Sequence, residues 1–166
     1  MMRENIRDFL QKDVRLAFRR SVPLAVLYLL CIPLIRGISN LDEAQSADCL
    51  LQSVSLVGII LITPVLKGEL SEEIREVVRA KQWGYGKTVC VRLGLAAGLT
   101  AGMMIVFAAV MRENRCVFSF WRETRKAVGI SCLMGSVGLL ASWAGKSPAA
   151  GYLAALGCYG VLIFGV

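Results

Sequence analysis

Five blocks of almost uninterrupted apolar residues dominate this chain. They cover residues 21–38, 49–66, 91–111, 127–145 and 148–166. A transmembrane helix needs roughly 20 mostly apolar residues, and each block is about that long. A soluble helical bundle would carry charges along one face of every helix, whereas the stretch LGLAAGLTAGMMIVFAAVM in the third block has none. We therefore expect an all-α, polytopic membrane protein with about five transmembrane helices in one domain, residues 1–166.

Composition favours a membrane protein over a nucleic-acid-binding protein. Of the 166 residues, 56% are hydrophobic and 19% are charged, a more apolar balance than that of a soluble domain. The net charge of +7 comes from basic residues beside the apolar blocks, as in MRENIRDFLQKDVRLAFRR and RENRCVFSFWRETRK. Basic residues in that position favour contact with lipid headgroups. The expected partner is therefore the lipid bilayer, and nucleic acid is not expected.

The six cysteines form no CxxC pair. Four of them, Cys31, Cys90, Cys132 and Cys158, fall in or at the ends of apolar segments, as is typical of small packing residues. The chain also has no histidine, so no metal site is expected.

An amphipathic interfacial helix is predicted over residues 4–20, because apolar residues recur there at helical spacing with basic residues between them. The residues expected at the membrane interface are Arg7, Phe9, Leu10, Arg15, Phe18 and Arg19. A solvated charged leader is the alternative. The basic residues just before the first apolar block predict a cytoplasmic N-terminus in the cell membrane.

That orientation places the acidic loop around residues 39–48 outside, residues 67–87 in the cytoplasm and residues 112–126 outside. The segment 112–126 is strongly basic, which conflicts with the tendency of basic loops to stay in the cytoplasm. An alternative is that this segment lies as an interfacial helix. The last block runs to Val166 without a polar flank, which leaves open whether a sixth span belongs to the protein.

Three glycines form overlapping GxxxG patterns in the third block: Gly94, Gly98 and Gly102. They leave one face of that helix nearly smooth, and the pattern predicts close helix packing. The packing partner is either another helix of this chain or a second copy.

Several kinds of chemistry lack the residues they need. Without histidine the usual general base is missing, and the five blocks contain no Asp or Glu for a proton relay or an intramembrane protease. The chain also has no GxxxxGK[ST] phosphate loop. We therefore do not expect an enzyme, and ATP hydrolysis, if it is used, must come from another subunit.

A short cytoplasmic helix is predicted over residues 71–83. Ser71 can cap a helix that opens with two glutamates, which suit the positive end of the helix dipole. Ile74, Val77 and Val78 form a narrow apolar stripe. Such a helix can dock in a groove of a soluble partner or rest on lipid headgroups.

This order of elements resembles the permease subunits of type-2 ABC exporters. A second match is GLLASWAGKSPAAGYLAAL, which is similar to the passage from the fourth to the fifth span in that family. The resemblance implies that the loop helix is a coupling helix, whose partner-binding residues are Glu72, Glu73, Ile74, Arg75, Val77, Val78 and Arg79. The chain departs from the family at its C-terminal end, where members usually have a re-entrant region and a sixth span.

The resemblance further implies a bacterial cell membrane, an ATP-binding partner subunit that holds ATP and magnesium, and a second permease copy in a homodimer or heterodimer. The implied function is ATP-driven export of a hydrophobic or amphipathic substrate. A non-transporting membrane scaffold or accessory subunit is one alternative. A channel or facilitator is another, although the apolar blocks offer only scattered polar residues to line a pore.

Overall fold

The computed structural model of the protein describes residues 18–69 and 85–164. Every element in this part of the chain is helical, and none of its residues forms a strand, so the all-α fold class is confirmed there. The elements are α2 (Ser21–Arg36), α3 (Glu43–Asp48), η1 (Cys49–Val54), α4 (Leu56–Ile62), η2 (Thr63–Glu69), α6 (Tyr85–Glu113), α7 (Phe120–Ala144) and α8 (Pro148–Phe164). The predicted loop helix and most of the predicted N-terminal helix lie outside the described residues.

Three helical stretches in the described part are long and apolar enough to cross a membrane: Glu43–Leu66, Val89–Glu113 and Phe120–Ala144. The helices α2 and α8 are apolar but shorter, with 16 and 17 residues. At about 1.5 Å per residue, α2 is roughly 24 Å long, which is less than the ~30 Å of a typical hydrocarbon core. The protein thus has the helices of a membrane protein, and the total of five spans stays a prediction.

The helices α6 and α7 extend beyond the predicted block edges. The helix α6 runs from Tyr85 to Glu113 and so exceeds the predicted 91–111 on both sides, while α7 begins at Phe120, well before the predicted 127. Arg, Lys and Glu are good helix formers, so the helix continues where the apolar block stops. The basic segment 112–126 is therefore divided between the end of α6, a short connection and the first turns of α7. It does not form a separate interfacial helix.

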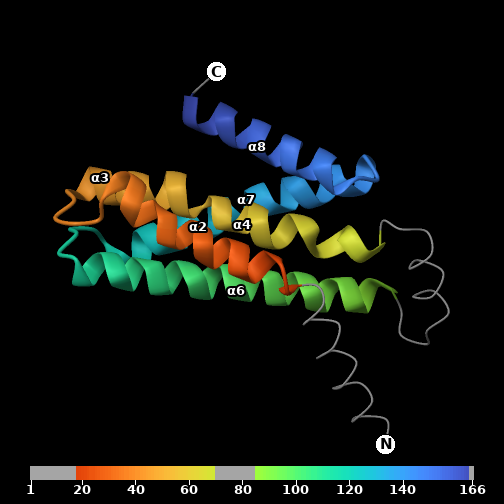
Figure 1. Cartoon of the computed structure of the whole chain (residues 1–166), viewed down its shortest axis with the longest axis horizontal. Coiled ribbons are helices and arrows are strands. Elements are labelled where there is room, and N and C mark those ends of the chain that lie inside the picture. The colour runs from red at the N-terminus through yellow and green to blue at the C-terminus, as the bar shows by residue number, and fades with distance from the viewer. Residues whose placement is uncertain (1–17, 70–84, 165–166) are drawn as a thin grey trace, which may run out of the picture.

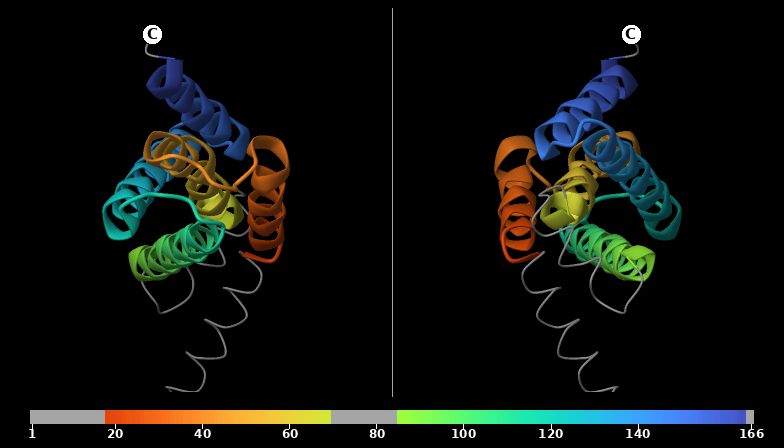
Figure 2. Two further views of the ribbon diagram at one scale, coloured as in Figure 1. Left: turned by 90° about the vertical axis from the view of Figure 1, so that its left-hand side faces the viewer. Right: turned by 90° about the vertical axis from the view of Figure 1, so that its right-hand side faces the viewer.

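Successive helices run in opposite directions along the bundle (Figure 1). The starts of α2 and α6, the end of η2 and the turn between α7 and α8 lie toward one end, and the α2–α3 and α6–α7 connections lie at the other. In the end-on views, the stretch from α3 to η2 lies among the other helices, and α8 leans away (Figure 2). Of the apolar window of this central stretch 67% is buried, against 28% for Val89–Glu113 and 33% for Phe120–Ala144.

The central stretch is also the most irregular one. It passes from α-helix through the π-helical turns of η1 into α4, and then into the 3-10 helix η2. Pro64 lies in η2, and proline lacks the N–H that an α-helical hydrogen bond requires. The most buried helix of the bundle is thus the one whose backbone hydrogen bonding departs most from the regular pattern.

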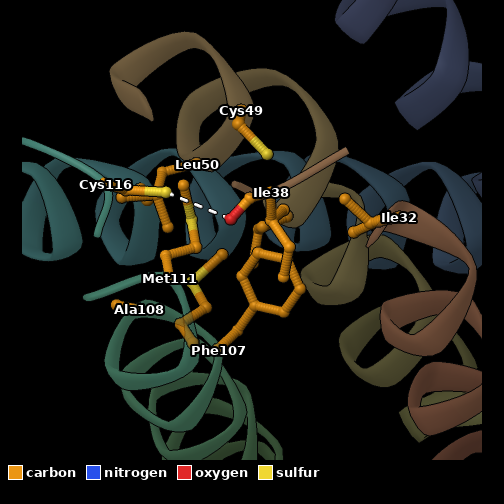
Figure 3. Close-up of a cluster of buried hydrophobic side chains, with 11 residues drawn as sticks. Ile32, Ile38, Cys49, Leu50, Phe107, Ala108, Met111 and Cys116 are labelled. Atoms are coloured by element: carbon orange, nitrogen blue, oxygen red, sulfur yellow. Dashed lines mark hydrogen bonds between the residues drawn. The ribbon is translucent and has the colours of Figure 1, made fainter. Parts of the chain in front are cut away.

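The two connections at one end of the bundle are joined by backbone hydrogen bonds, and we call this end the clasp end. The Asn40 N–H donates to the Asn114 carbonyl at 3.1 Å, and the Val117 N–H donates to the Leu41 carbonyl at 3.1 Å. The Cys116 thiol donates to the Ile38 carbonyl at 3.4 Å (Figure 3). Ile38 and Cys116 belong to a core cluster that also includes Ile32, Cys49, Leu50, Met104, Phe107 and Met111.

Candidate functional site

Most of the residues predicted to bind partners lie outside the described residues. This holds for the coupling-helix residues from Glu72 to Arg79, and for Arg7, Phe9, Leu10 and Arg15 of the predicted interface. Arg19 is described and exposed. Phe18, by contrast, is only 6% exposed and belongs to a core cluster with Val57 and Leu61. Its ring therefore packs against the helix bundle, and the predicted position at the membrane interface stays a prediction.

The predicted glycine stripe of α6 is not covered by another helix in the described structure. A Cβ atom added at Gly94, Gly98 or Gly102 would meet no heavy atom within 4 Å. The three glycines instead form part of an open groove of about 700 Å³ between α2 and α6, lined by apolar residues from Val26 to Pro33 and from Gly94 to Val110. Within the described part of the chain, these three glycines therefore do not pack closely against another helix. Packing of this face against a second copy stays a prediction.

Close packing occurs at a different set of glycines, at the contacts of the central stretch with α7 and of α7 with α8. A Cβ at Gly135 would lie 2.7 Å from the Ile62 side chain. At Gly58 it would overlap the Ser131 carbonyl, and at Gly151 the Ser142 hydroxyl. Small residues of this kind let helix backbones approach closely in a membrane.

A polar cluster surrounds the π-helical turns of η1, and we call it the η1 cluster. The Tyr28 hydroxyl of α2 donates to the Ser53 carbonyl at 2.7 Å, and the Ser131 hydroxyl of α7 donates to the Ser55 carbonyl at 2.8 Å. The Tyr159 hydroxyl of α8 donates to the Gln52 carbonyl. Irregular helix turns leave carbonyls that need partners inside a membrane, and three helices supply them here.

The η1 cluster continues to the charged residue of α2. Arg36 donates to the Gln52 side-chain oxygen at 3.0 Å. Next to this pair lies a cleft of about 250 Å³ at the clasp end, lined by Arg36, Gly37, Leu41, Gln45, Asp48 and Cys49. Asp48 is the only carboxylate that lines this cleft, and the cluster itself consists of hydroxyls, amide and carbonyl groups. The arrangement can hold helices in register, because each of these hydrogen bonds joins two different helical elements.

Sequence reasoning missed the η1 cluster. Tyr28, Gln52 and Tyr159 are far apart along the chain, and single polar residues in apolar blocks are common. The one available signal was the run CLLQSVS, in which three polar residues interrupt the second block. That run shows that polar groups need partners, but it does not identify the helices that provide them.

Cysteines and charged residues complete the inventory of reactive groups. All six cysteines are free, with Cys49 and Cys116 buried and Cys90 and Cys158 exposed on the bundle surface. The interpretation of Cys90 and Cys158 as packing residues stays a prediction. Arg92 of α6 is only 9% exposed. Among the described residues, no group of three or more His, Cys, Asp or Glu side chains is arranged to hold a metal ion.

No protein-family model matches the chain, and no curated protein or solved structure shows significant similarity to it.

Proposed function

We propose that this protein is the membrane-spanning permease subunit of an ATP-driven ABC exporter. In this proposal a separate subunit binds ATP and magnesium and hydrolyses the ATP. The helix from Glu72 to Gln82 transmits the movement of that subunit, and a second permease copy completes the transporter. The cargo is hydrophobic or amphipathic.

The observation that carries the proposal is the position of the helix ends. The end of η2 and the start of α6 lie toward the same end of the bundle as the start of α2 (Figure 1). The described residues on either side of the 70–84 segment, the end of η2 and the start of α6, therefore lie on one side of the bundle, and the start of α2 lies on that side too. A permease that is driven by a soluble ATPase needs its coupling helix and its N-terminal segment on the same face of the membrane.

The apolar groove between α2 and α6 supports the choice of cargo. Its lining consists of aliphatic, aromatic and thioether side chains and glycines, with no charged residue among them. A groove of this kind favours hydrocarbon over polar solutes, because burying an unpaired polar group in it costs free energy. The same lining disfavours an ion channel.

The decisive experiment tests the apolar stripe of the loop helix. We expect the double substitution I74D/V77D to lower co-purification of an ATPase subunit at least tenfold, because two carboxylates cannot be buried in an apolar groove. The bait is the tagged full chain expressed in its native host. The readout is the amount of any co-purified ATPase that carries a phosphate loop, measured by quantitative mass spectrometry.

The matched control is I74L/V77L, which keeps the stripe apolar and should retain the ATPase. Both variants should insert in the membrane to the same extent as the native chain. Equal recovery of the ATPase with I74D/V77D would contradict the coupling role. Failure of the native chain to retain that ATPase would contradict the exporter function and favour the scaffold alternative.

A further inference from the structure

One face of α7 carries exposed residues along its whole length. Trp121 is 66% exposed, Leu133 65%, Leu140 64% and Trp143 64%. At 3.6 residues per turn these positions fall on one side of the helix. Two tryptophans thus lie near the two ends of this surface, with the aliphatic residues Leu133 and Leu140 between them.

The spacing of the two tryptophans matches a bilayer. At about 1.5 Å per residue, Trp121 and Trp143 lie roughly 33 Å apart along α7, close to the ~30 Å thickness of the hydrocarbon core. Tryptophan prefers the interface between hydrocarbon and headgroups at both membrane surfaces. The exposed face of α7 therefore faces lipid, with Trp121 at the headgroup level of the clasp end.

Basic residues gather around Trp121. The Arg122 side chain is 69% exposed, and Arg125 is exposed next to it on the same face. The Arg125 Nε donates to the Trp121 carbonyl at 3.2 Å, which holds the guanidinium beside the indole. The terminal nitrogens of Arg125 have no hydrogen-bond partner in the described part of the chain, so they can bind an external acceptor.

The acidic residue nearest to these arginines is turned inward. Glu123 is only 7% exposed and accepts hydrogen bonds from the Lys126 ammonium at 3.0 and 3.3 Å. Arg122 lies 3.5 Å from the same carboxylate, but its largely exposed side chain makes that ion pair weak. The lipid-facing surface beside Trp121 is therefore cationic.

We propose that Arg122 and Arg125 bind the phosphate of an anionic phospholipid at the clasp end of α7. A guanidinium matches phosphate through two parallel N–H donors, and the depth marked by Trp121 is that of lipid headgroups. The acyl chains of this lipid lie along the aliphatic surface that includes Leu133 and Leu140. At the other end of α7, Lys146 is the one basic residue that follows Trp143 before α8 in the sequence, and it serves as the control position.

The proposal is independent of transport, because it depends only on α7 in a bilayer. It also gives a reason for the strongly basic segment 112–126. Anionic lipid bound there neutralises positive charge of this segment at the membrane surface.

The test compares retention of phosphatidylglycerol and phosphatidylcholine. The purified full chain is reconstituted in nanodiscs with equal amounts of the two lipids, and the lipids that stay bound are counted by native mass spectrometry. We expect the native chain to retain phosphatidylglycerol on the order of tenfold more than phosphatidylcholine, because two basic residues act together at the surface. R122Q/R125Q should abolish the preference, whereas K146Q at the other end should keep it.

A second variant and a soluble competitor complete the test. R122K/R125K keeps the positive charge and should retain part of the preference for phosphatidylglycerol. This variant separates the effect of lost charge from a folding defect in R122Q/R125Q. Glycerol phosphate at millimolar concentration should displace none of the lipid if the site requires a membrane-bound phosphate. Equal retention of the two lipids by the native chain, or an unchanged preference in R122Q/R125Q, would overturn the proposal. The proposal would also be overturned if R122Q/R125Q lost an oligomeric state of the native chain but kept its bound lipid. The two arginines would then contact a second copy of the chain instead of a lipid.

Discussion

Two regions of this protein carry glycines at helical spacing, and they behave in opposite ways. The glycines of α6 at positions 94, 98 and 102 lie on an open groove, where an added Cβ meets nothing. The glycines between the central stretch, α7 and α8 lie at contacts where a Cβ would overlap atoms of the neighbouring helix. A glycine pattern therefore shows that a helix can be approached closely. It does not show whether a neighbour is present.

The contrast also concerns backbone regularity. The helix α6 is continuous over 29 residues and presents its smooth face to the outside. The central stretch changes helix type three times and is held by hydroxyl groups from its neighbours. Regular helices satisfy their own backbone groups and can stand at the edge of the bundle, whereas an irregular helix in a membrane needs partners on several sides.

The largest effect is expected from a leucine at a closely packed glycine. In Gly138→Leu, the Cβ would overlap the Thr63 side chain and lie 3.2 Å from the Ala155 Cβ. Such overpacking should lower the free energy of unfolding by about 3 kcal/mol, a fall of roughly 10 °C in Tm. Thermal unfolding of the purified variant in nanodiscs measures this. A loss below about 1 kcal/mol would show that α7 and α8 do not pack as described.

An intermediate effect is expected from removing a single hydroxyl at the η1 cluster. Tyr159→Phe deletes the donor to the Gln52 carbonyl, so we expect a loss of about 0.6 kcal/mol, and at most about 1.7 kcal/mol. The matched control is Tyr152→Phe on the same helix, because the Tyr152 hydroxyl makes no hydrogen bond to any described residue. If both variants unfold alike, the η1 carbonyls do not depend on α8.

The smallest effect is expected on the open groove. A Cβ at Gly98 meets no neighbour and the groove beside it is open, so Gly98→Leu should change the free energy of unfolding by less than about 0.5 kcal/mol. The measurement is the same thermal unfolding, run beside Gly138→Leu. A large destabilisation of Gly98→Leu would mean that another helix covers the groove in the membrane. Cross-linking of a Gly98→Cys variant between two chains would then identify it as a second copy.

The sequence was informative wherever one residue class filled a whole segment. The apolar blocks predicted helices that the structure contains in every case, although two of them are shorter than a typical span. The edges were predicted less well, because charged residues such as Arg112 and Arg122 continue the helices beyond the apolar blocks. At the functional level, the predicted coupling residues from Glu72 to Arg79 lie outside the described residues, so their role stays a prediction.

The sequence by itself determined that the apolar segments need a lipid environment and that their secondary structure is helical. Uncharged stretches of this length require lipid, and backbone in lipid must bond to itself in helices. Only the tertiary structure decided which helix is central, which glycines are covered and which hydroxyls meet the carbonyls of η1. The physical reason is that lipid tails and leucine side chains are equally apolar, so hydrophobicity does not select the neighbours of a helix within the membrane. Shape and a few hydrogen bonds make that selection, and both depend on residues that are distant in the chain.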